Sequence, residues 1–150
     1  MFLGQYRYNV DDKGRLMIPA RFRQQLGENA YLTLGFDRCL MLMNEAYFRQ
    51  VYERINAMSL SDPTARLLRR LILANAYPVE VDKIGRILLP QPLRDFLNAD
   101  GEVILVGQGD YFEIWASKDW EEQQRLLLDT EANQKRFATL DLSSHPETQP

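Results

Sequence analysis

The sequence is short of the residue types on which metal centres and many enzymes depend. It has 150 residues but only one cysteine, Cys39, and one histidine, His145. A lone cysteine excludes a disulfide framework within the chain, and the two residues together are too few for a zinc site of the Cys and His type. We therefore predict no metal site, no cofactor and a reducing, cytoplasmic environment.

Sets of catalytic residues are equally scarce. A Ser/His/Asp triad would have to recruit His145 from the polar C-terminal end, and Cys39 lies in an apolar run where a core position is the better interpretation. The sequence contains no Gly-Xaa-Gly-Xaa-Xaa-Gly run and no phosphate-binding loop. We predict that the protein is not an enzyme, that it has no catalytic residues and that it takes no small-molecule substrate.

Long hydrophobic segments are missing as well. The most apolar run, residues 67–76, is short and carries Arg69 and Arg70, so it cannot span a bilayer. The N-terminal residues have no apolar core of the kind that a signal peptide needs. We predict that the protein has no membrane partner.

Charge is present in both signs but is unevenly distributed. The net charge is −3, with 45% hydrophobic and 26% charged residues, which is the balance of a globular protein. Residues 1–78 hold 11 Lys and Arg against 7 Asp and Glu, whereas residues 79–150 hold 7 against 14. Because binding depends on the local field of a surface, the first half is the better candidate for contact with a polyanion.

One motif occurs twice. Residues 11–23 read DDKGRLMIPARFR, and residues 82–94 read DKIGRILLPQPLR. At a constant spacing of 71 positions the motif pairs Asp11 with Asp82, Gly14 with Gly85, Arg15 with Arg86, Pro19 with Pro90 and Arg23 with Arg94. This match predicts a tandem duplication. A half of about 70 residues would bury little surface alone, so we expect the halves to pack together.

Each copy of the motif predicts two short strands joined by a tight turn, in the manner of a hairpin. Asp11 and Asp82 are expected to bond backbone N–H groups of the turns, and Gly14 and Gly85 to supply a positive φ angle. The return strand that follows Gly14 alternates in polarity. Its apolar side chains are therefore expected to face inward and Arg15 to face outward.

The same cycle of elements is predicted twice along the chain. The expected strands are residues 5–10, 15–18, 31–34, 39–43, 79–81, 86–89, 103–107 and 111–115. Short helices are expected to begin at Pro19 and Pro90, and longer ones after the N-caps Asn44 and Asp62. Eight short strands with tight turns and helices at the ends predict an α+β fold around a small barrel-like core.

Two helical segments carry specific predictions about burial. The helix after Asp62 is apolar over a wide arc, including Leu67, so we expect it to be largely buried, either against the other repeat or against another subunit. A final helix is expected to be capped by Ser117, with Trp120 and Leu127 facing inward.

The predicted domain plan has five parts. These are a first repeat at 5–47, a helical connector at 48–75, a second repeat at 76–119, a C-terminal helix at 120–138 and a disordered tail at 139–150.

Two interpretations of Arg15 and Arg86 remain open. Each arginine either pairs with the aspartate of its own turn, or stands on an exposed strand face and contacts a phosphate or a guanine edge. The two roles are compatible. The duplication favours binding, because two similar arginine-bearing units suit repeated half-sites in DNA.

Further basic residues surround the two turns and are candidates for phosphate contacts. These additional DNA-binding candidates are Lys13, Lys83, Arg21 and Arg23. Because the first copy lies in the basic half of the chain, Arg15 is predicted to be the main contact.

With both copies in view, the sequence resembles the bacterial MraZ family, whose members have two tandem SpoVT/AbrB-like domains. The resemblance covers residues 1–140. It rests on the two motifs, on MFLG at residues 1–4, on LVG at 105–107 and on FEIW at 112–115. One Asp-Xaa-Xaa-Gly-Arg motif is common, but two copies in this order within a chain of this length are specific.

The resemblance implies a double-split β-barrel of the AbrB/SpoVT swapped-hairpin type, capped by helices, and ring-like homo-oligomers. It also implies a nucleoid-associated repressor that binds short direct repeats in the promoter of its own division and cell-wall gene cluster. The DNA-contacting arginine of the family corresponds to Arg15 and, in the second copy, to Arg86. The alternative is an antitoxin-like or structural interaction module, since AbrB-type folds also hold toxin partners.

Overall fold

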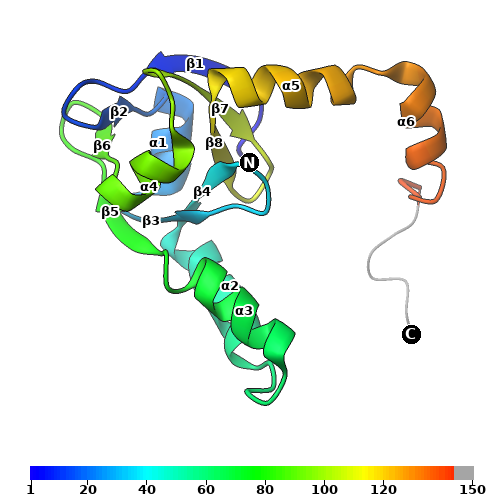
Figure 1. Ribbon diagram of the computed structural model, residues 1–150. Helices are drawn as coiled ribbons and strands as arrows, with labels where there is room; N and C mark the ends of the chain where they lie inside the picture. Colours follow the sequence, from blue (N-terminus) through cyan, green and yellow to red (C-terminus); the bar gives the residue numbers. More distant parts are fainter. Residues whose placement is uncertain (144–150) are drawn as a thin grey trace.

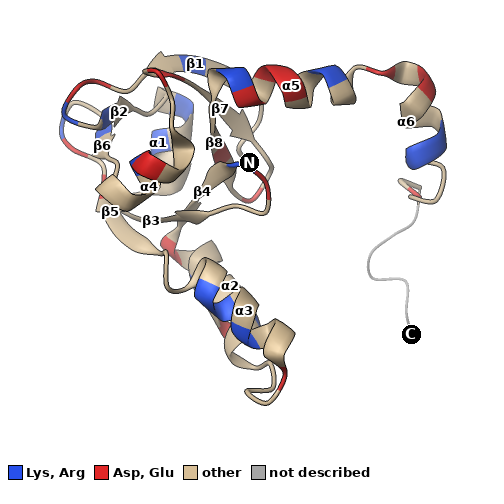
Figure 2. Cartoon of the chain, in the orientation of Figure 1, with Lys and Arg blue, Asp and Glu red and all other residues tan. Residues whose placement is uncertain are grey.

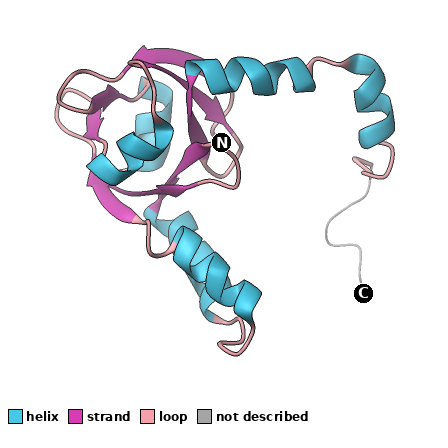
Figure 3. Ribbon diagram, in the orientation of Figure 1, coloured by secondary structure: helices cyan, strands magenta, loops and turns pink. Residues whose placement is uncertain are grey.

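The computed structural model describes residues 1–143, and it has a mixed α+β architecture (Figure 1). The strands are β1 (Gln5–Asn9), β2 (Arg15–Met17), β3 (Asn29–Leu34), β4 (Cys39–Asn44), β5 (Tyr77–Glu80), β6 (Arg86–Leu88), β7 (Glu102–Gly107) and β8 (Phe112–Ala116). The helices are α1 (Ala20–Leu26), α2 (Glu45–Asn56), α3 (Pro63–Ile72), α4 (Gln91–Leu97), α5 (Ser117–Leu127) and α6 (Thr130–Arg136). The strands are concentrated in the body of the molecule, whereas its two projections are helical (Figure 3).

The sheets interleave the two halves of the chain. One antiparallel sheet has the order β1-β7-β8-β4-β3-β5, and the second sheet pairs β2 with β6. Strand β1 of the first half therefore pairs with β7 of the second, and β4 pairs with β8. These pairings confirm the expectation that the halves pack together, because neither half could form these ladders alone.

The predicted local hairpins β1–β2 and β5–β6 are wrong. Strand β1 is hydrogen-bonded to β7, and β2 is hydrogen-bonded to β6 from the other repeat. Between β1 and β2 only the ends of the turn are bonded, for example the Asp11 N–H to the Arg15 carbonyl at 3.0 Å. Pairing with β6 places β2 against the core that the two repeats share, and the side chain of Leu16 at its centre is fully buried. The free energy from burying this side chain favours the pairing with β6 over a hairpin with β1.

The core is built from equivalent positions of the two repeats. Leu16, Ile18, Phe22 and Leu26 are each at most 1% exposed. Their counterparts 71 positions on are also buried, and these are Ile87, Leu89, Leu93 and Leu97. Burial of each such side chain contributes about 1.5–3 kcal/mol relative to exposure, so the shared core is the main force that joins the repeats.

Short helices α1 and α4 begin in the same way in both repeats. Pro19 and Pro90 occupy the N-cap positions, with nearly identical backbone angles. At the other end Gly27 and Asn98, again 71 apart, both have positive φ. Gly and Asn are the residues that tolerate this conformation best, which explains why both helices end there.

Helices α2 and α3 lie side by side and project from the body as a hairpin (Figure 1). The predicted caps are confirmed: Asn44 accepts a hydrogen bond from the Tyr47 N–H at 2.8 Å, and Asp62 accepts one from the Thr64 N–H at 2.9 Å. The expectation that α3 is largely buried is wrong for a single chain. Leu67 is 64% exposed, because one face of α3 has nothing packed against it within the described chain.

The C-terminal segment also departs from expectation. Trp120 is buried as predicted, but Leu127 is 41% exposed, and Ser117 does not cap the helix because Ala116 holds the N-cap position. Two helices, α5 and α6, occupy the part expected to hold one. The break occurs because Asp129 caps a new helix by accepting from the Ala132 N–H at 3.1 Å. Most of the predicted tail lies outside the described residues.

Cys39 is fully buried, as predicted for a core residue. Burial raises the pKa of its thiol, so this side chain stays in the unreactive protonated form. Within residues 1–143 no group of three or more His, Cys, Asp and Glu could hold a metal ion, and His145 lies beyond them. No helix in that range is long and apolar enough to cross a membrane.

Candidate nucleic-acid interface

The repeated motif forms a two-stranded ribbon to which each repeat contributes one strand. In this β2–β6 ribbon Arg15 lies opposite Leu88, and Met17 lies opposite Arg86. The intervening residues Leu16 and Ile87 are buried, so the alternation of a strand places both arginines on the outer face. The ribbon lies at the end of the molecule away from α6 (Figure 1).

In the first turn the Asp11 carboxylate binds both backbone and side chain. Its Oδ1 accepts from the N–H groups of Lys13 at 3.0 Å and Arg15 at 2.8 Å, and its Oδ2 accepts from Nε of Arg15 at 2.8 Å. Gly14 completes the turn with φ +85°. The aspartate thus fixes the start of β2 and the arginine that stands on it.

The second turn repeats this arrangement around Asp82. Its Oδ1 accepts from the N–H groups of Ile84, Gly85 and Arg86, each at 2.9 Å. Its Oδ2 accepts from Nε of Arg86 at 3.0 Å. The two aspartate–arginine pairs are therefore geometrically equivalent.

Hydrogen bonding to the charged form alters the acidity of both aspartates. The Arg15 backbone N–H has the largest effect in lowering the pKa of Asp11, and the Arg86 backbone N–H has the largest effect on the pKa of Asp82. Both pKa values fall below the ordinary value of 3.8. Both carboxylates are therefore ionised near neutral pH and hold their arginines by charge as well as by hydrogen bonds.

The ion pairs leave part of each guanidinium free of hydrogen bonds. Arg15 and Arg86 use Nε for the carboxylate, and within residues 1–143 their terminal nitrogens donate no hydrogen bond to the protein. A guanidinium offers five N–H donors. Both interpretations of these arginines thus agree with the geometry, since the aspartate orients the side chain and leaves donors for a phosphate or a guanine edge.

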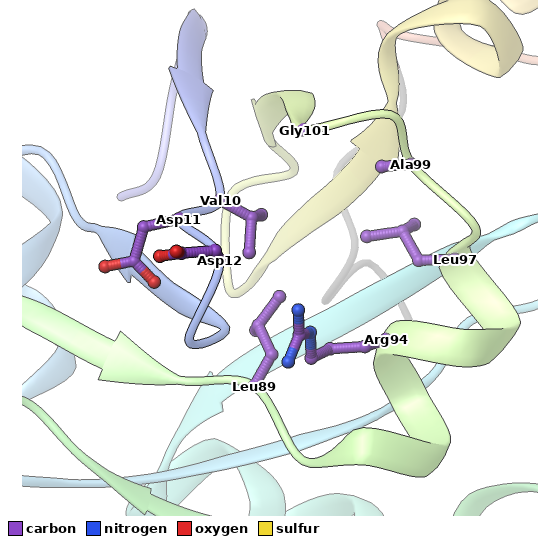
Figure 4. A pocket seen from close by; sticks show the side chains of 8 residues that line it. All are labelled: Val10, Asp11, Asp12, Leu89, Arg94, Leu97, Ala99 and Gly101. Carbon is purple, nitrogen blue, oxygen red and sulfur yellow. The ribbon is translucent and has the colours of Figure 1, made fainter.

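A second pair of arginines, Arg23 and Arg94, packs across the boundary between the repeats. Arg94 of α4 points toward the turn that carries Asp11 and Asp12, across a hollow of about 340 Å³ that residues of both repeats line (Figure 4). A Cβ atom on Gly14 would lie only 2.8 Å from Nη1 of Arg94. Arg94 of the second repeat therefore packs against the first turn at Gly14.

The reciprocal contact is made by Arg23 of α1. A Cβ atom on Gly85 would collide with Nη1 of Arg23, and the same nitrogen donates to the Ile84 carbonyl at 3.5 Å. Nε of Arg23 is buried and has no hydrogen-bond partner within the described residues. Arg23, which the sequence grouped with the first turn, thus lies against the second.

The other predicted site residues remain at the surface. Lys13 and Lys83 are exposed in their turns, and Arg21 is exposed on α1. The lysines are not equivalent, because 71 positions after Lys13 stands Ile84, whose side chain is 60% exposed.

The regions around the two turns carry the same net positive charge, in contrast to the two halves of the chain. Residues 11–23 hold four Lys and Arg against two Asp, and residues 82–94 hold three against one. Twelve of the 14 acidic residues of the second half come after Arg94. Acidic residues are prominent along α5, away from the ribbon (Figure 2). The acidity of the second half therefore does not distinguish its turn from the first.

Two residues of this region escaped the sequence-based list of candidates. Leu88 is 59% exposed on the outer face beside Arg15, and Arg94 supports the first turn. The spacing of 71 did pair Arg94 with Arg23, but no local signal showed that the two contacts cross between repeats.

Comparison with known proteins reproduces the internal duplication. The family model described as "MraZ protein, putative antitoxin-like" matches the chain twice, over residues 1–71 and 72–142. The chain belongs to the MraZ family. The two matches meet at the C-terminal end of α3 and place one copy of the turn in each MraZ repeat.

Three relatives resemble this chain over most of their length. A protein of Thermomicrobium roseum is 44% identical over 141 residues, which cover 93% of this chain and 99% of the relative. A protein of a Roseiflexus species is 39% identical over 138 residues, covering 92% and 94%. One of Herpetosiphon aurantiacus is 44% identical over 121 residues, covering 81% and 85%. Each of these relatives is named a transcriptional regulator MraZ.

Proposed function

We propose that this protein is a sequence-specific DNA-binding transcriptional regulator of the MraZ type. In this proposal it represses its own division and cell-wall gene cluster by binding short direct repeats in the promoter. The names of its relatives support the regulatory role. The observation that carries the proposal is the β2–β6 ribbon, whose outer face holds one oriented arginine from each repeat.

The strand pairing and the outward arginines of the ribbon support a role in major-groove recognition. A two-stranded antiparallel ribbon fits the major groove of B-form DNA, and arginine is the commonest partner of guanine O6 and N7. Arg15 and Arg86 would read base edges. Lys13, Lys83 and Arg21 would contact phosphates and supply salt-dependent affinity. Arg23 is assigned a supporting role at the second turn instead of a direct contact.

We infer that the eight strands make up a double-split barrel of the swapped-hairpin type. The ribbon is joined through its two turns to β1 and β5, which are the outermost strands of the six-stranded sheet. This connection supports closure of the sheet through the ribbon. The predicted repeats 5–47 and 76–119 would then be the two swapped units, with residues 48–75 as connector.

A single ribbon offers few contacts, and ring-like homo-oligomerisation would multiply them. Several ribbons on one assembly would bind several direct repeats of the same promoter. After the first ribbon has bound, the effective concentration of the other ribbons near the remaining repeats is high. The proposed assembly acts in the cytoplasm on the nucleoid.

A gel-shift titration with the protein's own upstream DNA tests the role of the ribbon. Arg15→Ala is expected to weaken binding by about 5- to 160-fold, because a lost bidentate guanine contact costs about 1–3 kcal/mol. Arg49→Ala is a matched control, since Arg49 also forms an i,i+4 ion pair, with Glu45 at 3.9 Å, but on α2. Undiminished binding by Arg15→Ala at both low and high salt would contradict the assigned role.

The antitoxin-like alternative is favoured by one observation, the description of the family model itself. Under this hypothesis the chain would hold a protein partner encoded beside it. A neighbouring toxin gene and co-purification of its product in fixed ratio would support it. If footprints are found only on the chain's own promoter and no toxin gene lies beside it, the repressor hypothesis is supported instead.

A further inference from the structure

The hollow beside the first turn has the size and lining of a small-molecule site (Figure 4). Its volume of about 340 Å³ falls within the range of about 300–1,000 Å³ that such sites occupy. The first repeat contributes the acidic residues Asp11 and Asp12, and the second contributes Arg94 of α4. The rest of the lining is Val10, Leu89, Leu97, Ala99 and Gly101. The contact proposed between the ribbon and DNA gives this hollow no role.

The two aspartates differ in what they can offer a ligand. Both oxygens of Asp11 already accept hydrogen bonds from the turn and from Arg15. The Asp12 carboxylate is exposed, and within residues 1–143 it makes no hydrogen bond and no ion pair. Asp12 is therefore the acidic group of the hollow that is free to accept from a ligand cation.

Arg94 supplies the opposite charge. Its guanidinium lies between Leu89 and Leu97 and points toward the first turn (Figure 4). Within the described residues it forms no ion pair, and its side chain donates a single hydrogen bond, from Nη1 to Oε1 of Gln91 at 3.4 Å. Because a guanidinium has five N–H donors, most of them remain for a carboxylate, which it can bind in a bidentate manner.

This pattern of charge selects a class of ligand. A simple anion would be attracted by Arg94 but repelled by the two aspartates, and a simple cation would meet the reverse problem. A small zwitterion with a carboxylate and an ammonium group satisfies both charged sides at once. The apolar residues between them favour a ligand that also carries an apolar side chain.

The second turn does not offer the same chemistry. At the repeat spacing of 71, Lys83 takes the place of Asp12, and Glu28 takes the place of Ala99. An ammonium group beside the second turn would therefore meet a lysine instead of a free carboxylate. The proposed ligand chemistry is a property of the first turn alone.

The hollow is in direct contact with the turn that orients Arg15. The Leu89 N–H donates to the Gly14 carbonyl at 2.8 Å, and the Arg94 guanidinium packs on Gly14. Asp11, which lines the hollow, also holds Nε of Arg15 at 2.8 Å. A molecule bound in the hollow is thus connected to Arg15 through a single residue.

We propose that the hollow binds a small zwitterion of the amino-acid class with an apolar side chain. The ligand carboxylate accepts from Arg94, its ammonium group donates to Asp12, and its side chain packs against Leu97 and Ala99. The bound ligand bridges the first turn and α4, which restricts the turn that orients Arg15 and strengthens promoter binding. The strengthening rests on the proposed DNA-binding function, whereas the ligand site does not.

Equilibrium dialysis with labelled leucine tests the site in the absence of DNA. Leucine is expected to bind once per chain. Unlabelled N-acetylleucine, which lacks the ammonium group, and leucinamide, which lacks the carboxylate, should compete at least about 10-fold more weakly, because each loses one charge-assisted contact. Alanine and phenylalanine probe the size of the hollow in the same way. If none of the three amino acids binds at millimolar concentration, the proposal is overturned.

Two variants test whether the ligand lies in this hollow. Asp12→Asn removes the partner of the ammonium group, and Ala99→Leu fills the hollow without changing its charge. Each should weaken leucine binding at least about 10-fold with an unchanged circular dichroism spectrum. Asp110→Asn is the matched control, since Asp110 is an exposed aspartate in the turn between β7 and β8, and it should bind leucine normally. Normal leucine binding by both hollow variants would overturn the assignment.

Gel-shift titrations with and without leucine test the coupling to DNA. Saturating leucine is expected to strengthen promoter binding about 5-fold, and by linkage promoter DNA should raise leucine affinity by the same factor. Arg86→Ala, in the other turn, should lose promoter affinity but bind leucine normally. Leucine binding that leaves promoter affinity unchanged would overturn the coupling. Normal promoter binding by a chain that binds no leucine would overturn the site and leave the DNA-binding function intact.

Discussion

The two copies of the aspartate–glycine–arginine turn are nearly the same in structure although they lie in halves of opposite charge. Each aspartate accepts from backbone N–H groups and holds its arginine through Nε, at 2.8 Å in the first turn and 3.0 Å in the second. Each turn also rests on an arginine that the other repeat supplies. The turns differ mainly at their tips, where Asp12 and Lys13 of the first correspond to Lys83 and Ile84 of the second.

This comparison shows that charge counted along a sequence is a poor guide to charge on a surface. The basic first half predicts Arg15 as the main DNA contact, with Arg86 as either a second DNA contact or a residue retained only for the fold. The strand pairing instead places both arginines on one ribbon with similar local charge, and the surplus acidic residues follow Arg94. We therefore expect the two arginines to contribute comparably.

The largest expected effect is the loss of DNA affinity when the arginine of either turn is replaced. Arg15→Ala and Arg86→Ala should each weaken promoter binding by about 1–3 kcal/mol, and the double variant should lose nearly all sequence preference. Gel-shift titrations against the promoter and against unrelated DNA measure both losses. If only Arg15→Ala loses affinity, the two arginines are not equivalent, and Arg15 is the main DNA contact, as the charge of the two halves predicts.

The next effect concerns the glycines of the turns. Gly14→Ala should destabilise the fold by about 2 kcal/mol, because a non-glycine residue at positive φ costs about 1–2 kcal/mol and the new methyl group must displace Arg94. Gly109→Ala is the matched control, since its φ of +86° is almost the same but no atom lies within 4 Å of the added Cβ. Urea unfolding measures the free energy of unfolding of the two variants. Equal destabilisation would show that Arg94 moves aside freely.

A smaller effect tests the exchange of arginines between repeats. Arg94→Ala should loosen the first turn and Arg23→Ala the second, each by about 1 kcal/mol. Each change removes a guanidinium packed on the turn, and Arg23→Ala also removes the hydrogen bond to the Ile84 carbonyl. Hydrogen exchange of the Gly14 and Gly85 amides reports each turn separately. Loosening of the turn in the same repeat, instead of the opposite one, would contradict the crossed contacts.

The smallest effect is expected from pH. Because the pKa values of Asp11 and Asp82 lie below 3.8, these carboxylates stabilise the fold above that pH, and the stabilisation is lost as pH falls through their lowered values. Carboxyl titration by NMR should show both groups titrating below the ordinary aspartate value of 3.8. Arg15→Ala should move the pKa of Asp11 upward and leave that of Asp82 unchanged.

The sequence predicted much of the local structure because local structure depends on neighbours in the chain. Asn44 and Asp62 cap their helices as expected, and the buried series from Leu16 to Leu26 follows the alternation and helical spacing of the sequence. Long-range partners were harder to predict. Residue patterns say which face of a strand is buried but not which strand lies beside it, so β2 was paired with β1 instead of β6.

By itself the sequence determined the duplication, the aspartates and glycines of the turns, the positions of the strands and the buried side chains of each repeat. Only the tertiary structure decided that β2 pairs with β6, that Arg23 and Arg94 cross between the repeats, and that Leu67 of α3 and Leu128 after α5 stay exposed within residues 1–143. The physical reason is that caps, turns and alternation are set by residues a few positions apart. Strand pairing and the partners of apolar faces are set instead by how much surface the whole assembly can bury.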